Sequence, residues 1–264
     1  MPVIYDLRQG LLTYFLRTSG SVAERVGKRK LFPIGEQRKH LELFKRPRPT
    51  VYVADYKEPI DYGVAWDWQK EIIRQRVKKE ADEDMLLVLQ HPQVYTLGRG
   101  SSTEHVKFDP ENSEIKLYRT ERGGEVTCHA PGQIVMYPII DLRRYHKDLH
   151  WYLFQLEEVI INALRKFEIE GKRDSEHTGV WVGTAKIAAV GINVTRWWSM
   201  HGLALNVDNQ LEDFDRITPC GIEDRQVCSV TSLNPEVTYE EVRKEMLLCF
   251  EDLFNCELSA AQTH

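Results

Sequence analysis

Apolar positions recur along the chain with two periods, which together predict a mixture of helices and strands. A spacing of three to four residues predicts helices over residues 62–77, 150–168 and 239–254. The helix over 150–168 has the clearest pattern, and a capping box formed by Thr238 and Glu241 precedes the last helix. On the first helix we expect a buried stripe made by Ala65, Trp68, Ile72 and Arg76.

Shorter apolar runs, alternating or continuous, predict strands. They occur at residues 51–53, 86–89, 94–97, 116–119 and 134–140, and a hairpin joins 180–182 to 186–196 through Gly183 and Thr184. Pro138 places its strand near a sheet edge or at a strand end, because proline cannot donate to a ladder. Strands and helices mix without regular alternation, so we expect an α+β fold with a mixed or antiparallel sheet flanked by helices.

Charge is unevenly distributed and divides the chain into two parts. The 264 residues carry a net charge of −5, but residues 1–49 hold 11 Lys and Arg against 4 Asp and Glu, and the remainder holds 24 against 36. We therefore expect a basic leader or linker over residues 1–49 and a single domain over residues 50–264. The leader is interpreted either as a disordered or added tail or as an organelle transit segment, although its acidic residues weaken the second interpretation.

Several classes of function lose support because their motifs are absent from the sequence. It contains no Walker A loop, no G-x-G-x-x-G after a strand, no G-x-S-x-G and no H-E-x-x-H. His146 and His150 flank charged residues at a helix start, so we interpret them as a solvated face and expect no metal. The net charge argues against a nucleic-acid partner, and no apolar run reaches the length of a membrane span. The five cysteines form no C-x-x-C, which favours a reducing compartment and free thiols.

Four segments carry candidate chemistry, and the first two contain a glycine pair and a lysine. Residues 122–133 read Arg-Gly-Gly-Glu-Val-Thr-Cys-His-Ala-Pro-Gly-Gln, where the adjacent glycines allow a backbone to pass very close to a bound chain. The glycine pair alone would favour an ordinary strand with a glycine bulge, but the twelve residues together favour a site. Lys186 opens an apolar strand, where partial desolvation would make its amine a usable base, although a lone hairpin lysine is usually solvated.

The other two segments contain a cysteine turn and a His-Gly strand. Cys220 lies between a proline and a glycine on a tight turn, where a thiol can be exposed. A free thiol has a pKa of about 8.5, so a neighbouring ammonium would raise its small thiolate fraction at neutral pH. The alternative is a buried structural cysteine, which is our interpretation of Cys228, Cys249 and Cys256. In residues 200–206, His-Gly precedes an apolar strand whose backbone could line an acyl slot.

Taken together and in this order, the four segments resemble the lipoyl(octanoyl) transferases of the LipB family. The likeness runs from about Tyr52 to Ser232 and is carried by Arg-Gly-Gly-x-Val-Thr-x-His-x-Pro-Gly-Gln, Gly-x-x-Lys-Ile, His-Gly-Leu-Ala-Leu-Asn and Pro-Cys-Gly. It implies a fold like the catalytic domain of biotin and lipoate ligases. It also implies an octanoyl-[acyl carrier protein]:protein N-octanoyltransferase that acts in protein lipoylation without a cofactor.

The resemblance also assigns roles to residues and partners. It implies that Cys220 carries octanoyl as a thioester, and that Lys186 lowers the pKa of that thiol and shuttles protons. The residues that would line the acyl pocket are Arg122, Gly123, Gly124, Glu125, Val126, Thr127, Cys128, His129, Ala189, Val190, Gly191, Gly202, Leu203 and Ala204. The implied donor is octanoyl-acyl carrier protein, and the implied acceptors are the lipoyl domains of 2-oxoacid dehydrogenase E2 subunits and the glycine cleavage H protein. We expect a monomer.

Two positions depart from the usual pattern of the family. Ala130 stands where glycine is typical, and if this position needs a positive φ, alanine costs roughly 1 kcal/mol and reshapes the loop. Cys128 stands where an aromatic residue is typical, so it could widen the pocket and is a rival nucleophile. We retain Cys220 because both Pro-Cys-Gly and Lys186 match the family.

Two rival functions and two locations remain open. An ATP-dependent lipoate–protein ligase would share the fold but would need an adenylate-binding surface, and a requirement for ATP would distinguish it. A non-catalytic protein that binds lipoyl domains or acyl carrier protein is disfavoured by the intact Lys186 and Cys220. The segments 118–122, 148–153 and 196–197 look most like the plant plastid branch, with the mitochondrion as the second location.

Overall fold

The helices and strands assemble around a long mixed sheet. The computed structural model describes residues 43, 46–110, 112–218 and 226–261. The strands within these residues are β1 (Thr50–Asp55), β2 (Asp84–Leu89), β3 (Val94–Leu97), β4 (Lys116–Arg119), β5 (Thr127–His129), β6 (Gln133–Ile139), β7 (Lys172–Arg173), β8 (Val180–Val182), β9 (Ala185–Thr195), β10 (Trp198–Asn206) and β11 (Glu257–Ala260). The helices are α4 (Tyr62–Lys78), α5 (Leu149–Lys166), α6 (Val230–Leu233) and α7 (Tyr239–Leu253), with short 3-10 helices at Thr103–His105 and Glu212–Arg216.

The described strands form two sheets. Eight of them form one sheet in the order β11-β1-β2-β6-β10-β9-β8-β7, and a smaller sheet has the order β4-β3-β5. In the large sheet β1 is parallel to both β2 and β11, and the remaining neighbours are antiparallel. In the small sheet β3 is parallel to β4 and antiparallel to β5. This arrangement is the predicted α+β fold with a mixed sheet.

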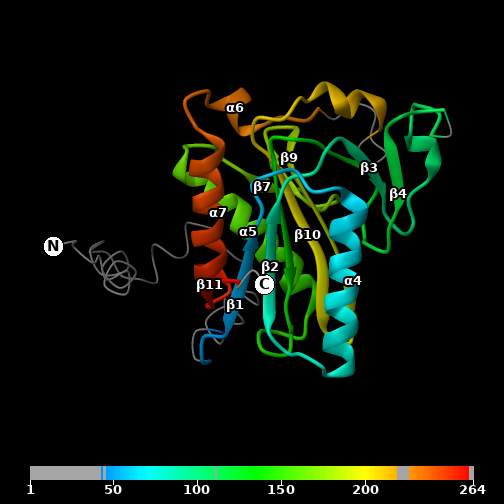
Figure 1. Cartoon of the computed structure of the whole chain (residues 1–264). Coiled ribbons are helices and arrows are strands. Elements are labelled where there is room, and N and C mark those ends of the chain that lie inside the picture. The colour runs from blue at the N-terminus through cyan, green and yellow to red at the C-terminus, as the bar shows by residue number, and fades with distance from the viewer. Residues whose placement is uncertain (1–42, 44–45, 111, 219–225, 262–264) are drawn as a thin grey trace, which may run out of the picture. The chain divides into compact units, whose positions relative to one another are not determined.

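Helices cover both faces of the large sheet. Figure 1 shows α4 on one face, with α5 and α7 on the other. Ala65 and Ile73 of α4 belong to a buried cluster with Leu87, Val135 and Ala204 of the sheet. On the opposite face α5 packs against β8, β9, β10 and α7. All these elements lie within one compact unit, Leu43–His264.

The helices α5 and α7 each begin after a residue whose side chain caps the helix. The Thr238 hydroxyl accepts the N–H of Glu241, whose carboxylate accepts the N–H of Thr238 at 2.9 Å. This is the predicted capping box, and α7 begins directly after it. Asp148 caps α5 in a related way, since its carboxylate accepts the N–H groups of His150 and Trp151 at 3.0 and 3.1 Å. Each cap satisfies N–H groups that have no partner within the helix.

The buried face of α4 differs from the predicted stripe. Its buried residues are Tyr62, Ala65, Gln69, Ile73 and Arg76. Trp68 and Ile72, which were predicted to belong to the stripe, are only half-buried. Gln69 is buried because its side-chain oxygen accepts the backbone N–H of His201 at 2.8 Å. A hydrogen bond to the sheet therefore turns a polar position inward, which apolar periodicity does not predict.

Pro138 lies near the end of its strand, as predicted. The other prediction, that its strand lies at the edge of the sheet, is wrong. Its strand, β6, lies between β2 and β10 in the interior of the large sheet. The neighbouring strand accommodates the proline with a glycine, because a Cβ on Gly202 would lie only 2.7 Å from Pro138 Cδ and 2.2 Å from the oxygen of Met136. His201, the preceding residue, has a φ of 59°.

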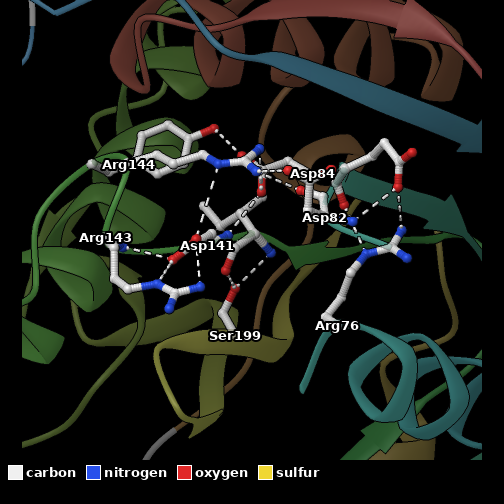
Figure 2. Close-up of polar contacts among 10 residues, drawn as sticks. Arg76, Asp82, Asp84, Asp141, Arg143, Arg144 and Ser199 are labelled. Atoms are coloured by element: carbon white, nitrogen blue, oxygen red, sulfur yellow. Dashed lines mark hydrogen bonds and ion pairs between the residues drawn. The ribbon is translucent and has the colours of Figure 1, made fainter. Parts of the chain in front are cut away.

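A buried carboxylate network joins the start of β2 to the end of β6 (Figure 2). The carboxylate of Asp84 is fully buried and accepts the N–H of Asp141 at 2.8 Å and the hydroxyl of Tyr145 at 3.0 Å. The guanidinium of Arg144 lies 3.6 Å from Asp84 and 3.2 Å from Asp82. Burial raises the pKa of Asp84 to about 6 despite these partners.

This raised pKa predicts a pH-dependent stability. Because the folded pKa lies above the ordinary value of 3.8, protonated Asp84 contributes stability that is fully present below about pH 4 and is lost as the pH rises through about 6. Between pH 4.5 and pH 7 we expect the free energy of unfolding to fall by about 2 kcal/mol in the wild type relative to Asp84→Asn, in which position 84 does not titrate. Urea unfolding of both proteins at pH 4.5 and pH 7 measures the difference, and parallel changes in the two proteins would contradict it.

No helix in the described ranges is both long enough and apolar enough to cross a membrane.

Candidate active site

A cavity of about 220 Å³ lies among β5, β9, β10 and the start of α4. Segments that are far apart in the sequence contribute to its lining. Of the fourteen residues predicted for the acyl pocket, twelve line it: Arg122, Gly124, Glu125, Val126, Thr127, His129, Ala189, Val190, Gly191, Gly202, Leu203 and Ala204. Lys186 lines the same cavity. The pairing of β9 with β10 brings two of the three segments together, because Ala189 lies opposite Ala204 and Gly191 opposite Gly202.

Gly123 and Cys128 are not among the lining residues. Gly123 donates its N–H to the oxygen of Ile192 at 3.0 Å, which attaches the glycine pair to β9. In β5 successive side chains alternate, so Thr127 and His129 face the cavity and Cys128 faces the opposite side. There Cys128 is fully buried in a cluster with Tyr95, Leu97, Val126, Phe214 and Ile217. Burial raises the pKa of its thiol to about 12.

Arg122 holds the glycine pair in place. Its guanidinium is buried and donates to the carbonyl oxygen and hydroxyl of Thr96 at 2.7 and 2.8 Å, and to the oxygen of Gly123 at 3.0 Å. Gly191 packs against this loop, since a Cβ there would lie 2.9 Å from the oxygen of Gly123. The arginine therefore lies inside the wall of the cavity, where it secures the close approach of two backbones that the glycines permit.

Lys186 is the second residue of β9, directly after the hairpin turn. Its Nζ donates to the carbonyl oxygen of Thr178 at 3.0 Å and lies 5.3 Å from the centre of the Trp181 ring. Its backbone N–H donates to the oxygen of Gln226, and its backbone oxygen accepts the N–H of Cys228, both at 2.9 Å. The chain that follows Cys220 is thus attached to the lysine by two hydrogen bonds.

Cys220 lies in the segment 219–225, outside the described residues. The chain on both sides of this segment is described. Phe214 before it and Val227 after it both line the cavity. Thr218, two residues before Cys220, donates its N–H to the oxygen of His105 at 2.8 Å. The role of Cys220 therefore stays a prediction, supported by the position of its flanking residues.

The part of the cavity near α4 contains two tyrosines that the sequence did not indicate, Tyr62 and Tyr137. His201, which belongs to the predicted His-Gly segment, lines the cavity with them. Burial lowers the pKa of His201, although Glu121, whose carboxylate lies 3.6 Å from the imidazole, acts in the opposite direction. Burial raises the pKa of Tyr62 to about 12. His129 is also held neutral, because burial lowers its pKa well below the usual range. These groups supply hydrogen-bonding surface without charge at neutral pH.

Ala130 adopts no positive φ, whereas Gly132 does, with a φ of 93°. The alanine therefore costs no left-handed strain, and the glycine that the turn requires stands two residues later. A Cβ on Gly132 would lie 2.4 Å from the carboxylate of Asp208, so this glycine is also required by the packing of the turn.

The described residues contain no cluster of side chains that could hold a metal ion, because no three His, Cys, Asp or Glu residues there come together in such a group.

Solved structures with the same fold are lipoate ligases. A crystal structure of lipoate-protein ligase A bound with ATP has a TM-score of 0.68 and 15% identity, and the match covers 83% of this chain and 90% of that chain. A bipartite lipoate protein ligase from Thermoplasma acidophilum has a TM-score of 0.62 and 15% identity, covering 83% of this chain and 88% of that chain. At this identity the likeness establishes the fold alone, which is the predicted ligase-type catalytic domain.

Sequence relatives define the family. The family described as the lipoyl protein ligase A/B catalytic domain matches residues 61–251. The chain is 50% identical over 200 residues to an octanoyltransferase of Thermosynechococcus vestitus, covering 76% of this chain and 88% of that protein. It is 52% identical over 192 residues to a chloroplastic octanoyltransferase of Arabidopsis thaliana, covering 71% of this chain and 69% of that protein. The chain belongs to the lipoyl protein ligase A/B catalytic domain family, and within it to the LipB-type octanoyltransferases.

Proposed function

We propose that this protein is an octanoyltransferase that takes octanoyl from octanoyl-acyl carrier protein and attaches it to a lysine of a lipoyl domain. The observation that carries the proposal is the meeting of residues 122–129, 189–191 and 202–204 around one cavity, with Lys186 on its wall. The names of the relatives, which are about half identical over three quarters of the chain, support the same reaction.

In the proposed first step, Cys220 takes the acyl group from the donor. The amine of Lys186 accepts the thiol proton, and the resulting thiolate attacks the thioester carbonyl. The carrier thiolate leaves and takes up the proton, so one thioester is broken and another is formed. Because the two thioesters have similar energies, this step needs no nucleoside triphosphate.

In the proposed second step, the acceptor lysine attacks the Cys220 thioester as a neutral amine. The Cys220 thiolate leaves, an amide forms, and Lys186 takes the proton that the amine loses. An amide is more stable than a thioester, so this step makes the overall reaction favourable. Backbone N–H groups near the reacting carbonyl would stabilise its oxyanion by about 3 kcal/mol per donor.

The shape of the cavity suits an acyl chain. Its volume of about 220 Å³ lies below the roughly 300–1,000 Å³ that is typical of pockets for drug-sized ligands. Val126, Ala188, Ala189, Val190, Leu203 and Ala204 supply apolar surface along it. Burying such a chain contributes about 0.8 kcal/mol per methylene.

The direct test of this function is transfer without ATP. We expect the purified chain, mixed with octanoyl-acyl carrier protein and a lipoyl domain, to add one octanoyl group to the domain in the absence of any nucleotide. Intact-protein mass spectrometry of the acceptor measures the product. Transfer of free octanoate or lipoate only when ATP is added would instead identify a lipoate–protein ligase, and donor binding without transfer would identify a non-catalytic binding protein.

We also propose the partners and the location of the reaction. The acceptors are the lipoyl domains of 2-oxoacid dehydrogenase E2 subunits and the glycine cleavage H protein, and the enzyme acts as a monomer. A plastid location is supported by the chloroplastic relative and by the basic residues 1–49. The alternative location is the mitochondrion. Imaging of the tagged chain in plant cells would distinguish the two organelles.

A further inference from the structure

One peptide group joins Lys186 to a buried carboxylate. The carbonyl oxygen of Thr178 accepts a hydrogen bond from Lys186 Nζ at 3.0 Å. The N–H of the same peptide group, which belongs to Gly179, donates to Glu157 Oε1 at 2.8 Å. The amine that donates at one end and the carboxylate that accepts at the other polarise the peptide in the same direction, so each hydrogen bond strengthens the other.

The carboxylate of Glu157 is itself held in place. It projects from the middle of α5, and its second oxygen accepts Arg173 Nε at 3.0 Å. The same guanidinium donates to the oxygen of Phe154 at 2.9 Å and to Glu158 at 2.7 Å, and it lies 3.5 Å from the centre of the Phe154 ring. Rotation of Glu157 away from the peptide would leave Arg173 and the buried N–H of Gly179 without this partner.

Gly179 allows the lysine side chain to cross the peptide. It has a φ of 127°, a conformation that residues with a side chain rarely adopt. A Cβ at this position would lie 2.6 Å from the oxygen of Ala188, and 2.7 and 3.2 Å from Cε and Nζ of Lys186. The end of the lysine side chain therefore runs directly over the glycine, and its place depends on this peptide.

We propose that Glu157 is a positioning residue for acyl transfer, which acts by fixing the Thr178–Gly179 peptide that holds the Lys186 amine. Glu157 itself is not among the residues that line the cavity. This inference rests on the proposed function, because it gives Glu157 its role through Lys186. Glu176 and His177, from the loop that precedes β8, line the same cavity as this lysine.

The test compares three variants in single-turnover formation of the octanoyl adduct. We expect Glu157→Ala to slow acylation roughly 10- to 100-fold with an unchanged half-saturating donor concentration, because the amine is displaced while the pocket stays intact. Glu157→Gln keeps an oxygen that can accept the Gly179 N–H, so it should stay within about threefold of the wild type. Glu158→Gln is the matched control, since Glu158 binds Arg173 but not the peptide.

Thermal unfolding separates positioning from mere support of the fold. Both Glu157→Gln and Glu158→Gln lose a charge partner of Arg173, so both should melt at a lower temperature than the wild type while retaining their rates. A rate that follows the melting temperature across all three variants, or Glu157→Ala at the wild-type rate, would overturn the inference. A wild-type chain that never becomes acylated would instead refute the proposed function.

Discussion

Replacement of Lys186 by alanine should lower octanoyl transfer about 10²- to 10⁴-fold, which is the usual contribution of a general base. The amine lies on the wall of the cavity, held by the oxygen of Thr178, and Lys186 is the one lysine among the described residues that line the cavity. Without the amine, the thiol proton in the first step and the amine proton in the second lose the acceptor that the proposed mechanism gives them. Donor binding should persist, because the residues that line the acyl pocket are unchanged.

The measurement is the rate of acyl transfer to a lipoyl domain, together with the affinity for octanoyl-acyl carrier protein. Lys172→Ala provides the control, since Lys172 is an exposed lysine of β7 and does not line the cavity. It should transfer at the wild-type rate. If Lys186→Ala also transferred within a factor of three of the wild type, the lysine would have no part in the chemistry.

Cys220→Ser should reduce transfer by roughly 10³-fold or more, because a serine hydroxyl without a strong base is a poor substitute for a thiolate. Cys128→Ser should retain transfer. The thiol of Cys128 is fully buried on the side of β5 away from the cavity, and burial raises its pKa to about 12. It therefore lacks both access to the donor and thiolate character at neutral pH.

Steady-state transfer assays on the two variants, with circular dichroism to confirm that each is folded, make this comparison. Cys128→Ser replaces a buried sulfur by a hydroxyl, so a modest loss of stability is expected in that variant. Loss of transfer in Cys128→Ser at full folded content, with transfer retained in Cys220→Ser, would reverse the assignment.

The parts of the fold that depend on local pattern were predictable from sequence. The periodicity of α5 and the capping box of α7 depend on residues within one helix. The β8–β9 hairpin likewise depends on one short turn. Strand β11 was not predicted, because Glu257–Ala260 is a strand only through parallel pairing with β1, about two hundred residues earlier. The burial of Gln69 and the interior place of Pro138 also depend on distant partners, His201 and Gly202.

The candidate site follows the same division. Glycine pairs and a strand-opening lysine are visible in sequence, and twelve of the fourteen predicted pocket residues line the cavity. Tyr62 and Tyr137 carry no local signal, since each is an ordinary aromatic residue until the fold brings α4 and β6 together. Glu157 and Glu158 are buried acidic residues of a helix that buries mostly apolar side chains, but nothing in the sequence indicates their partner Arg173.

The central claim is that the acyl group passes through Cys220, and mapping the covalent adduct tests it most directly. The wild-type chain is mixed with octanoyl-acyl carrier protein, digested and examined by mass spectrometry with and without hydroxylamine. We predict one octanoyl group on the peptide that contains Cys220, removed by hydroxylamine as a thioester must be, and present also in Cys128→Ser. An adduct on the Cys128 peptide, or no adduct in a preparation that still transfers octanoyl, would contradict the account.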